Sequence, residues 1–570
     1  SETTGLSRHG LYYALNLFTA SRHFNKRQPG RQWAERLDSV SKAMAWWLQQ
    51  TTWGELDTVQ WINTSIEPVI TYYALAGHKD FISSGVAANL MTTLDALWQG
   101  YPNELSNKFQ SISLMNKASW LLNDDRYAWL AQQPKYDFMQ FRIGQSWWPA
   151  RIPVEITPNS PLTIIPASES VKNKYAPAIS MDKSFQFLVW RSGYGSNEDY
   201  LLVDGLNQGG RNPHHVAAIT YLRHNDKPLL SGYENQLFVL RNGLSGNYVP
   251  KAAALDTAHQ LGDAVYIRTT VPDGPFAIWQ RHILHVPGTN TLVADKITAK
   301  ESGDYELLRQ WKTVGKPKSS AVAPHNIAVY GEGRVAIVTD KGVRNYINGN
   351  RIDQRLYATL HDSESITLFS SIYANPATGL NRYYLEALKP NAALLRNTKD
   401  ALISAGPYSS AHIISDAVFG YLSPERLLFV EGRKLIIGND LIVSESPVSV
   451  NWDLVNGDID ISTPNKANIR LYVSDGSSPK VDNRKLTLEL QGGLLELSLE
   501  SGTYSLTGVY PNNGQYIDEI LGGIETIGLN SVQSPFYATN IRTWPAEKVA
   551  SFNSPIRHIV EGSAGSVPLL

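Results

Sequence analysis

The hydrophobic pattern of this 570-residue chain changes its period once, and that change limits the folds that the chain can adopt. Between residues 11 and 136 apolar residues recur every three or four positions, which is the spacing of amphipathic helices. Five prolines between residues 149 and 166 interrupt this pattern. From residue 185 onward, short runs of strand-forming residues replace it. The sequence therefore predicts an α+β chain in which a helical half precedes an antiparallel β half.

In the helical half we expect five or six antiparallel helices joined by short turns. The clearest apolar face consists of Trp33, Leu37, Val40, Met44, Trp47 and Leu48. Similar patterns cover residues 9–22, 65–76, 84–98 and 109–122. The breaks between them carry Pro-Gly, Trp-Gly and Tyr-Pro pairs, which are typical of turns.

In the β half we expect an antiparallel sandwich followed by a smaller β domain. The predicted strands of the sandwich are 185–191, 219–223, 236–240, 264–270 and 276–286. The predicted strands of the smaller domain are 426–430, 434–437, 441–443, 469–473 and 486–490. The domain boundaries that follow are 1–148 for the helical domain, 149–170 for a linker, 171–390 for the sandwich, and 391–570 for the smaller domain and tail.

Composition excludes several classes of function. Lys plus Arg number 51 and Asp plus Glu 52, so no overall charge attracts the chain to nucleic acid. No apolar run approaches the ~18 residues that cross a bilayer. The absence of Cys removes disulfides, thiolate metal ligands and Cys nucleophiles. The chain starts at Ser1 rather than Met, which suggests processing, so we expect a periplasmic or secreted protein.

The segment 209–222 has the strongest potential for chemistry. It is a Gly-rich polar loop that contains Arg211, His214 and His215 and leads directly into a predicted strand. Imidazoles titrate near neutral pH and can move protons, and a guanidinium beside them suits an anionic ligand such as a carboxylate. A structural role for the two histidines fits the same pattern equally well.

This part of the chain resembles the β-sandwich of the heparinase II/III-like polysaccharide lyases. The resemblance rests on FQFLVWRSGYGSNEDYLLVDGLNQGG, on HHVAAITYLRHNDKPLLS, and on IWQRHILHVPGTNTLVADKI with Arg281 and Asp295. It implies that the helical half forms an incomplete α/α toroid. The family commonly places an Asp after its His motif, where this chain has Val216. A structural divalent metal is possible in that family, but this difference leads us to expect no tightly held ion at the loop.

The resemblance also implies a catalytic tyrosine in the helical half. WINTSIEPVITYYALAG, residues 61–77, is similar to the family's polar loop and catalytic helix, so that Tyr72 or Tyr73 would transfer the proton and Asn63 would bind substrate. Asn16 on an earlier helix would neutralise the substrate carboxylate, with His9 as the second choice. A tyrosine on an amphipathic helix also fits a role in the core. If both tyrosines are structural, His9, Tyr12 and Tyr13 are the next candidates.

Aromatic residues outside the predicted helices favour a carbohydrate ligand. Trp61, Trp147 and Trp148 lie in predicted loops, and the apolar C–H faces of sugars stack on such rings. For Trp147 and Trp148, which adjoin the predicted linker, packing between domains explains the position nearly as well.

Together these features predict an enzyme, a polysaccharide lyase that cleaves a uronic-acid glycan by β-elimination. Such a reaction needs a proton-transferring Tyr or His and donors such as Asn16 and Arg211 on the carboxylate, and it requires no cofactor. The expected partner is an anionic polysaccharide, and the oligomeric state is left open. A glycoside hydrolase remains an alternative because Glu55, Asp57 and Glu67 lie close together in the sequence. A glycan-binding protein without catalysis is the other alternative.

Overall fold

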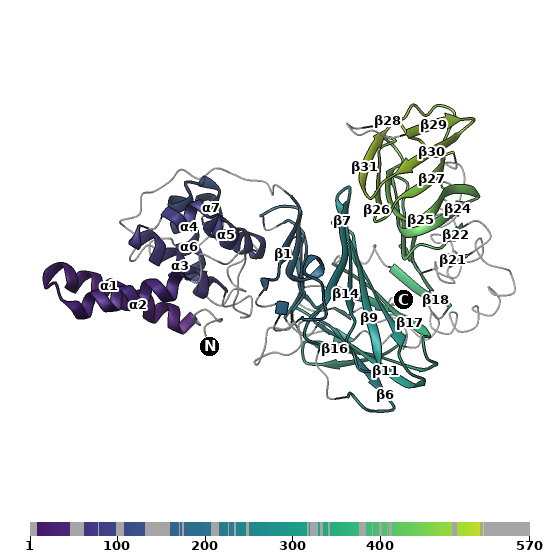
Figure 1. The fold of residues 1–570 in the computed structure, drawn as a ribbon. Coiled ribbons are helices and arrows are strands. Elements are labelled where there is room, and N and C mark those ends of the chain that lie inside the picture. The colour runs from purple at the N-terminus through teal and green to yellow at the C-terminus, as the bar shows by residue number, and fades with distance from the viewer. Residues whose placement is uncertain are drawn as a thin grey trace. The chain divides into compact units, whose positions relative to one another are not determined.

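A computed structural model of the chain (Figure 1) describes most residues between 8 and 512 together with Ile517. The residues outside the description are 1–7, 46–61, 78, 99–107, 132–159, 170–171, 174–175, 196, 207–215, 226, 233–234, 247–249, 316–317, 320–328, 331–334, 340–342, 375–382, 390–391, 398–401, 407, 410–412, 482–486, 513–516 and 518–570. The chain forms two compact units, residues 1–226 with 249–254, and residues 227–248 with 255–570. These units are defined by contacts, and the domain boundaries drawn from the sequence stay a prediction.

The first unit begins with helices, as the apolar periodicity predicts. The helices are α1 (Arg8–Arg27), α2 (Arg31–Ala45), α3 (Ile62–Ala76), α4 (Lys79–Ser83), α5 (Val86–Leu97), α6 (Lys108–Leu122) and α7 (Asp125–Leu130). The short connection between α1 and α2 makes them an antiparallel pair (Figure 1). The helices that the structure describes do not by themselves establish an incomplete α/α toroid, which stays an expectation.

A shared apolar core holds these helices together. Leu11, Ala14 and Phe18 of α1 follow helical spacing and are 8% exposed or less. They meet the central helix α3, which is buried on nearly every side, and α6 packs against the same cluster. Because α3 is apolar around most of its circumference, its burial rather than its helix propensity explains its stability.

Four antiparallel strands complete the first unit. They are β1 (Leu162–Pro166), β2 (Phe185–Arg191), β3 (Tyr200–Asp204) and β4 (Ile219–His224), in the order β1-β2-β3-β4. Every residue of β2 is buried, and its predicted bounds are confirmed. Phe187 and Val189 belong to the same core as the helices, so this sheet packs on them directly. Arg191 adds a polar connection, because its guanidinium donates to the carbonyls of Asp95 and Ala96 at the C-terminal end of α5.

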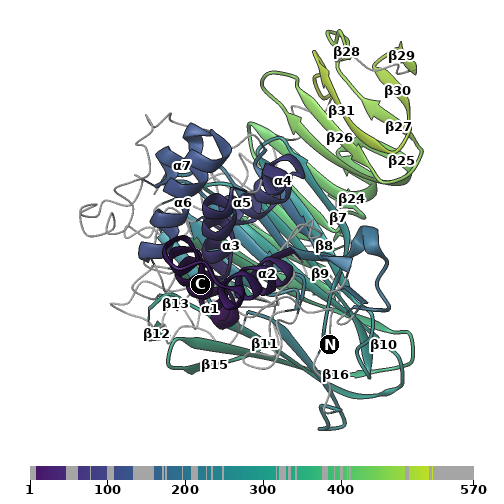
Figure 2. The ribbon, with the colours of Figure 1, turned by 60° about the vertical axis from the view of Figure 1, so that its left-hand side comes forward.

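The second unit is built almost entirely from antiparallel strands. Its first part consists of β5 (Lys227–Ser231), β6 (Leu237–Arg241), β7 (Ala254–Leu261), β8 (Ala264–Val271), β9 (Ala277–Val286), β10 (Asn290–Ala299), β11 (Gly303–Lys312), β12 (Lys318–Ser319), β13 (Val329–Tyr330), β14 (Val335–Thr339), β15 (Arg344–Asn348), β16 (Arg351–Leu360) and β17 (Ser365–Ala374). One sheet has the order β14-β17-β10-β9-β8-β7 and another the order β15-β16-β11-β6. Figure 2 shows β7, β8 and β9 side by side. Because Arg309 on β11 hydrogen-bonds the carbonyls of Leu368 and Phe369 on β17, the two sheets face one another as a sandwich.

A buried ionic network lies between these two sheets. The predicted hairpin 278–297 is confirmed as β9 and β10, and Arg281 and Asp295 are cross-strand partners in it. Arg281 Nε and Nη2 donate to the two oxygens of Asp295 over 2.7 and 3.0 Å, and Arg309 Nη1 lies 3.4 Å from the same carboxylate. All three side chains are fully buried. Burial alone would raise the pKa of Asp295, but the two guanidinium groups outweigh it, so the pKa lies below its usual range.

The remaining strands form one large branched sheet. They are β18 (Tyr383–Lys389), β19 (Ala392–Asn397), β20 (Leu402–Ala405), β21 (Tyr408–Ser409), β22 (Ile413–Ser415), β23 (Phe419–Leu422), β24 (Arg426–Ile437), β25 (Asn439–Asp453), β26 (Ile459–Thr463), β27 (Ala467–Tyr472), β28 (Lys480–Val481), β29 (Thr487–Gln491), β30 (Leu494–Leu499) and β31 (Gly502–Thr507). The two predicted strands 426–430 and 434–437 are one strand, β24. A β-bulge between them, with Glu431 at φ 50°, produced the apparent break in the sequence pattern.

No helix in the part of the chain that the structure describes is long and apolar enough to cross a membrane.

Candidate functional site

Three helices of the first unit bring a polar cluster together against the helical core. The Tyr12 hydroxyl on α1 donates to Glu67 Oε2 on α3 over 2.8 Å. Lys117 on α6 donates to Glu67 Oε1 and, over 3.1 Å, to Thr71 Oγ1. The side chains of Lys117 and Glu67 are only 9% and 13% exposed, so this ion pair is largely removed from water. We refer to Tyr12, Glu67, Thr71 and Lys117 as the tyrosine cluster.

Helical spacing explains how the cluster forms. Glu67 and Thr71 are four residues apart and therefore share one face of α3. Tyr12 follows the buried Leu11 on α1. Its side chain is half-buried, and its hydroxyl reaches Glu67 on α3. Burial, then the negative charge of Glu67 and the hydrogen bond to it, raise the pKa of Tyr12 well above its usual range. The phenol therefore stays protonated at neutral pH and donates a hydrogen bond to the carboxylate beside it.

Asn16, predicted to neutralise a substrate carboxylate, lies one helical turn after Tyr12. Residues four apart lie on the same face of a helix, and the Asn16 side chain is exposed to solvent. A hydrogen-bond donor in this position can reach a ligand bound beside Tyr12. The neighbouring Tyr13 points elsewhere and is 70% exposed.

Tyr72 and Tyr73, the two residues predicted to be catalytic, lie in the core. They are 2% and 3% exposed. Tyr72 stacks edge-on against Phe18, and Tyr73 stacks on Phe81 with ring centroids 4.1 Å apart. The Tyr73 hydroxyl donates over 2.5 Å to the carbonyl of Met44, in the last turn of α2, where carbonyls lack helical partners. Their catalytic role stays a prediction, but this geometry presents neither hydroxyl to a ligand.

The effect of Tyr73→Phe separates the two roles. Phe keeps the stacked ring and removes the hydroxyl, so the Met44 carbonyl loses its partner. We expect the free energy of unfolding to fall by about 1 kcal/mol and turnover to be retained. Urea denaturation and the initial rate measure the two effects. A kcat loss of 100-fold or more at unchanged stability would instead assign the proton transfer to Tyr73.

Several predicted site residues lie outside the described residues. The roles of these residues therefore stay predictions; they are Arg211, His214, His215, Trp61, Trp147, Trp148, Glu55 and Asp57. His9 lies in α1 and Asn63 in α3, but for these two only the backbone is described. The expectation that no ion is held tightly at the loop before Val216 likewise stays a prediction.

The structure adds a buried acid and imidazole pair that the sequence did not indicate. His224 Nδ1, at the end of β4, lies 3.1 Å from Asp199 Oδ2. Both side chains are 3% exposed or less, and the Asn225 amide also donates to Asp199 over 2.6 Å. A carboxylate and an imidazole are both groups that can ligate zinc. The contact connects the end of β4 to Asp199, the residue before β3.

No family model matches the chain, and no curated protein is similar to it in sequence. Among solved structures it is similar to heparan sulfate lyase HepC from Pedobacter heparinus, with 12% identity, a TM-score of 0.48, and coverage of 69% of this chain and 65% of that one. It is also similar to a heparinase III, with 10% identity, a TM-score of 0.47, and coverage of 69% and 66%.

A third match covers more of the chain but is weaker. The chondroitin lyase ODV-E66, a baculovirus envelope protein, has 9% identity and a TM-score of 0.27, and the match covers 88% of this chain and 93% of that one. The chain spans just under two thirds of the length of the two heparan-type lyases. TM-scores below 0.5 do not establish a shared fold.

Proposed function

We propose that this chain is a polysaccharide lyase that cleaves a uronic-acid-containing glycan by β-elimination. The observation that carries the proposal is the tyrosine cluster, in which a protonated phenol is hydrogen-bonded to a carboxylate and that carboxylate is paired with a lysine. The motifs that resemble the heparinase II/III-like family, in segments 185–231 and 278–297, also favour a polysaccharide lyase. No cofactor is required, and the expected location is periplasmic or secreted.

The cluster suits the proton transfer that β-elimination requires. As the substrate C5–H bond breaks, its proton passes to the Tyr12 oxygen while the phenol proton passes to Glu67. The electron pair of the C5–H bond forms the new C4–C5 double bond, and the bond to the glycosidic oxygen breaks. Glu67 then returns its proton through Tyr12 to the departing oxygen. Lys117 forms an ion pair with Glu67. Because the phenol proton leaves as the C5 proton arrives, Tyr12 never carries the full charge that its raised pKa disfavours.

The substrate carboxylate must be neutralised for the C5 proton to become acidic. A negative charge next to the forming carbanion opposes the reaction, and donors aimed at the carboxylate remove this penalty. Asn16 supplies an amide on the face of α1 that carries Tyr12. From the sequence, Arg211 and either His214 or His215 are further candidates to neutralise the carboxylate. Trp61, Trp147 and Trp148 are the candidates to stack on the sugar rings.

Ultraviolet absorbance tests this function directly. β-Elimination leaves a double bond conjugated with the carboxylate, so incubation with a panel of uronic-acid glycans should produce absorbance that grows with time. A glycoside hydrolase would release reducing ends from the same panel without absorbance, and a binding protein would release neither. Reducing ends without absorbance, or no product from any glycan, would reject the proposal.

A further inference from the structure

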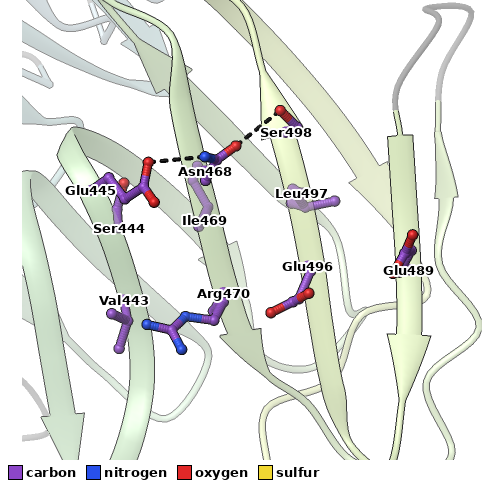
Figure 3. A pocket seen from close by; sticks show the side chains of 10 residues that line it. All are labelled: Val443, Ser444, Glu445, Asn468, Ile469, Arg470, Glu489, Glu496, Leu497 and Ser498. Carbon is purple, nitrogen blue, oxygen red and sulfur yellow. Dashed lines mark hydrogen bonds between the residues drawn. The ribbon is translucent and has the colours of Figure 1, made fainter.

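The second unit contains a hollow that the proposed reaction does not use. It lies on one face of the sheet formed by β25, β27, β30 and β29 and has a volume of about 600 Å³, within the range of small-molecule sites (Figure 3). Charged and polar side chains of alternate residues line it, because successive residues of a strand point to opposite faces. Ile469 and Leu497, whose neighbours in sequence form this lining, belong to the core beneath the sheet.

Charges of opposite sign lie in register across this hollow. Val443 pairs with Arg470, Arg470 with Glu496, and Glu496 with Glu489 on successive strands. The row therefore has the order apolar, positive, negative, negative. Neighbouring strands are about 4.8 Å apart, so a ligand that lies across the strands meets a cation and then two anions at this spacing.

Within the part of the chain that the structure describes, these charges are not neutralised. The Arg470 guanidinium makes no ion pair or hydrogen bond with any described residue, and the same holds for the carboxylates of Glu489 and Glu496. The second row of the hollow is different: Asn468 donates to Glu445 and accepts from Ser498, both over 2.9 Å (Figure 3). The hollow thus combines one row of polar side chains that are hydrogen-bonded to one another with a second row of charged side chains that are available to a ligand.

The charge pattern favours a particular class of ligand. With one guanidinium and three carboxylates, counting Glu445, the hollow has a net negative charge that repels a uniformly anionic glycan. The carboxylates of Glu445, Glu489 and Glu496 do not converge within 4.8 Å of one another, which argues against a shared metal ion. A ligand with a carboxylate for Arg470 and an ammonium group for Glu496 and Glu489 matches all three charges.

We infer that this hollow binds a zwitterionic stretch of glycan, in which a uronate residue adjoins a hexosamine with a free amino group. The inference rests on the proposed function for the choice of a uronic-acid glycan, and it names the substrate class more narrowly. Arg470 binds the uronate carboxylate, Glu496 and Glu489 bind the ammonium group, and Asn468 and Ser498 bind sugar hydroxyls.

Calorimetric titration of the full chain at low salt tests this assignment. The probes are a glucuronate–glucosamine tetrasaccharide with free amino groups, the same tetrasaccharide N-acetylated, and a glucosamine tetramer without carboxylates. The free-amine tetrasaccharide should bind about 2- to 5-fold more tightly than the N-acetylated form, the range expected for an exposed ion pair. Glu496→Gln should remove this difference. Arg470→Gln should weaken both uronate probes by a similar factor and leave the glucosamine tetramer unchanged.

A matched variant and a metal titration complete the design. Glu301→Gln removes one negative charge from an exposed ion pair with Arg241 in the same unit, outside the hollow, and should leave all three affinities unchanged. Equal affinity for the free-amine and N-acetylated probes, or calcium alone binding in a manner that Glu496→Gln abolishes, would overturn the inference. Binding of the probes and formation of the ultraviolet-absorbing product are separate measurements. Loss of the lyase proposal therefore shows as missing absorbance, and loss of this inference as missing amine selectivity.

Discussion

Tyr12→Phe should lower kcat of the proposed lyase reaction by about 10²- to 10⁴-fold, with little change in the dissociation constant of the glycan. The substitution removes the hydroxyl that donates to Glu67, which is the proposed proton relay, and retains the half-buried ring. An interaction made only during proton transfer is lost from kcat rather than from binding. Initial rates from ultraviolet absorbance, together with calorimetric binding of the substrate, measure the two quantities.

Tyr13→Phe is the matched control for this experiment. It makes the same chemical change one residue further along α1, where the side chain is 70% exposed, and should leave kcat unchanged. Comparable loss in both variants would indicate a general effect on α1 instead of chemistry at Tyr12. If Tyr12→Phe keeps full turnover while remaining folded, the tyrosine cluster only holds helices together and the proton donor lies elsewhere.

Asp295→Asn should destabilise the second unit by about 3–5 kcal/mol. Asn is nearly the same size, so the sandwich keeps its packing but loses the charge that neutralises Arg281 and Arg309. Two fully buried guanidinium groups would then lose the negative charge that both contact, which costs more than the lost hydrogen bonds. Urea denaturation measures the loss, and Trp279, whose indole donates to Asp295 over 2.9 Å, is a local fluorescence reporter.

Glu500→Gln provides the comparison for Asp295→Asn. It also removes one carboxylate charge, but from an ion pair with Lys466 whose side chains are 66% and 73% exposed. Water solvates both groups there, so the midpoint of unfolding should hardly move. A loss at Asp295→Asn no larger than at Glu500→Gln would mean that the sandwich admits water or rearranges around the arginines.

The sequence alone determined the type and approximate bounds of many elements. Strand β2 occupies the predicted residues 185–191, and the predicted hairpin 278–297 brings Arg281 opposite Asp295. These features depend on local periodicity and turn chemistry, which a single chain segment carries by itself. The same local patterns also predicted that helices precede strands along the chain. The bulge in β24 was missed because the break that it makes in the strand pattern resembles a turn between two strands, and a Glu residue such as Glu431 does not indicate a positive φ.

Only the tertiary structure decided which polar side chains meet. Tyr12 and Lys117 are 55 and 50 residues from Glu67 in the sequence, and they reach it because α1 and α6 both pack against α3. The same packing buries Tyr72 and Tyr73. Helix α3 is apolar on nearly every side, so its periodicity does not indicate which of its tyrosines faces a ligand. Local sequence determines that a residue lies in a helix. Whether its side chain is exposed depends on the other elements that pack against that helix.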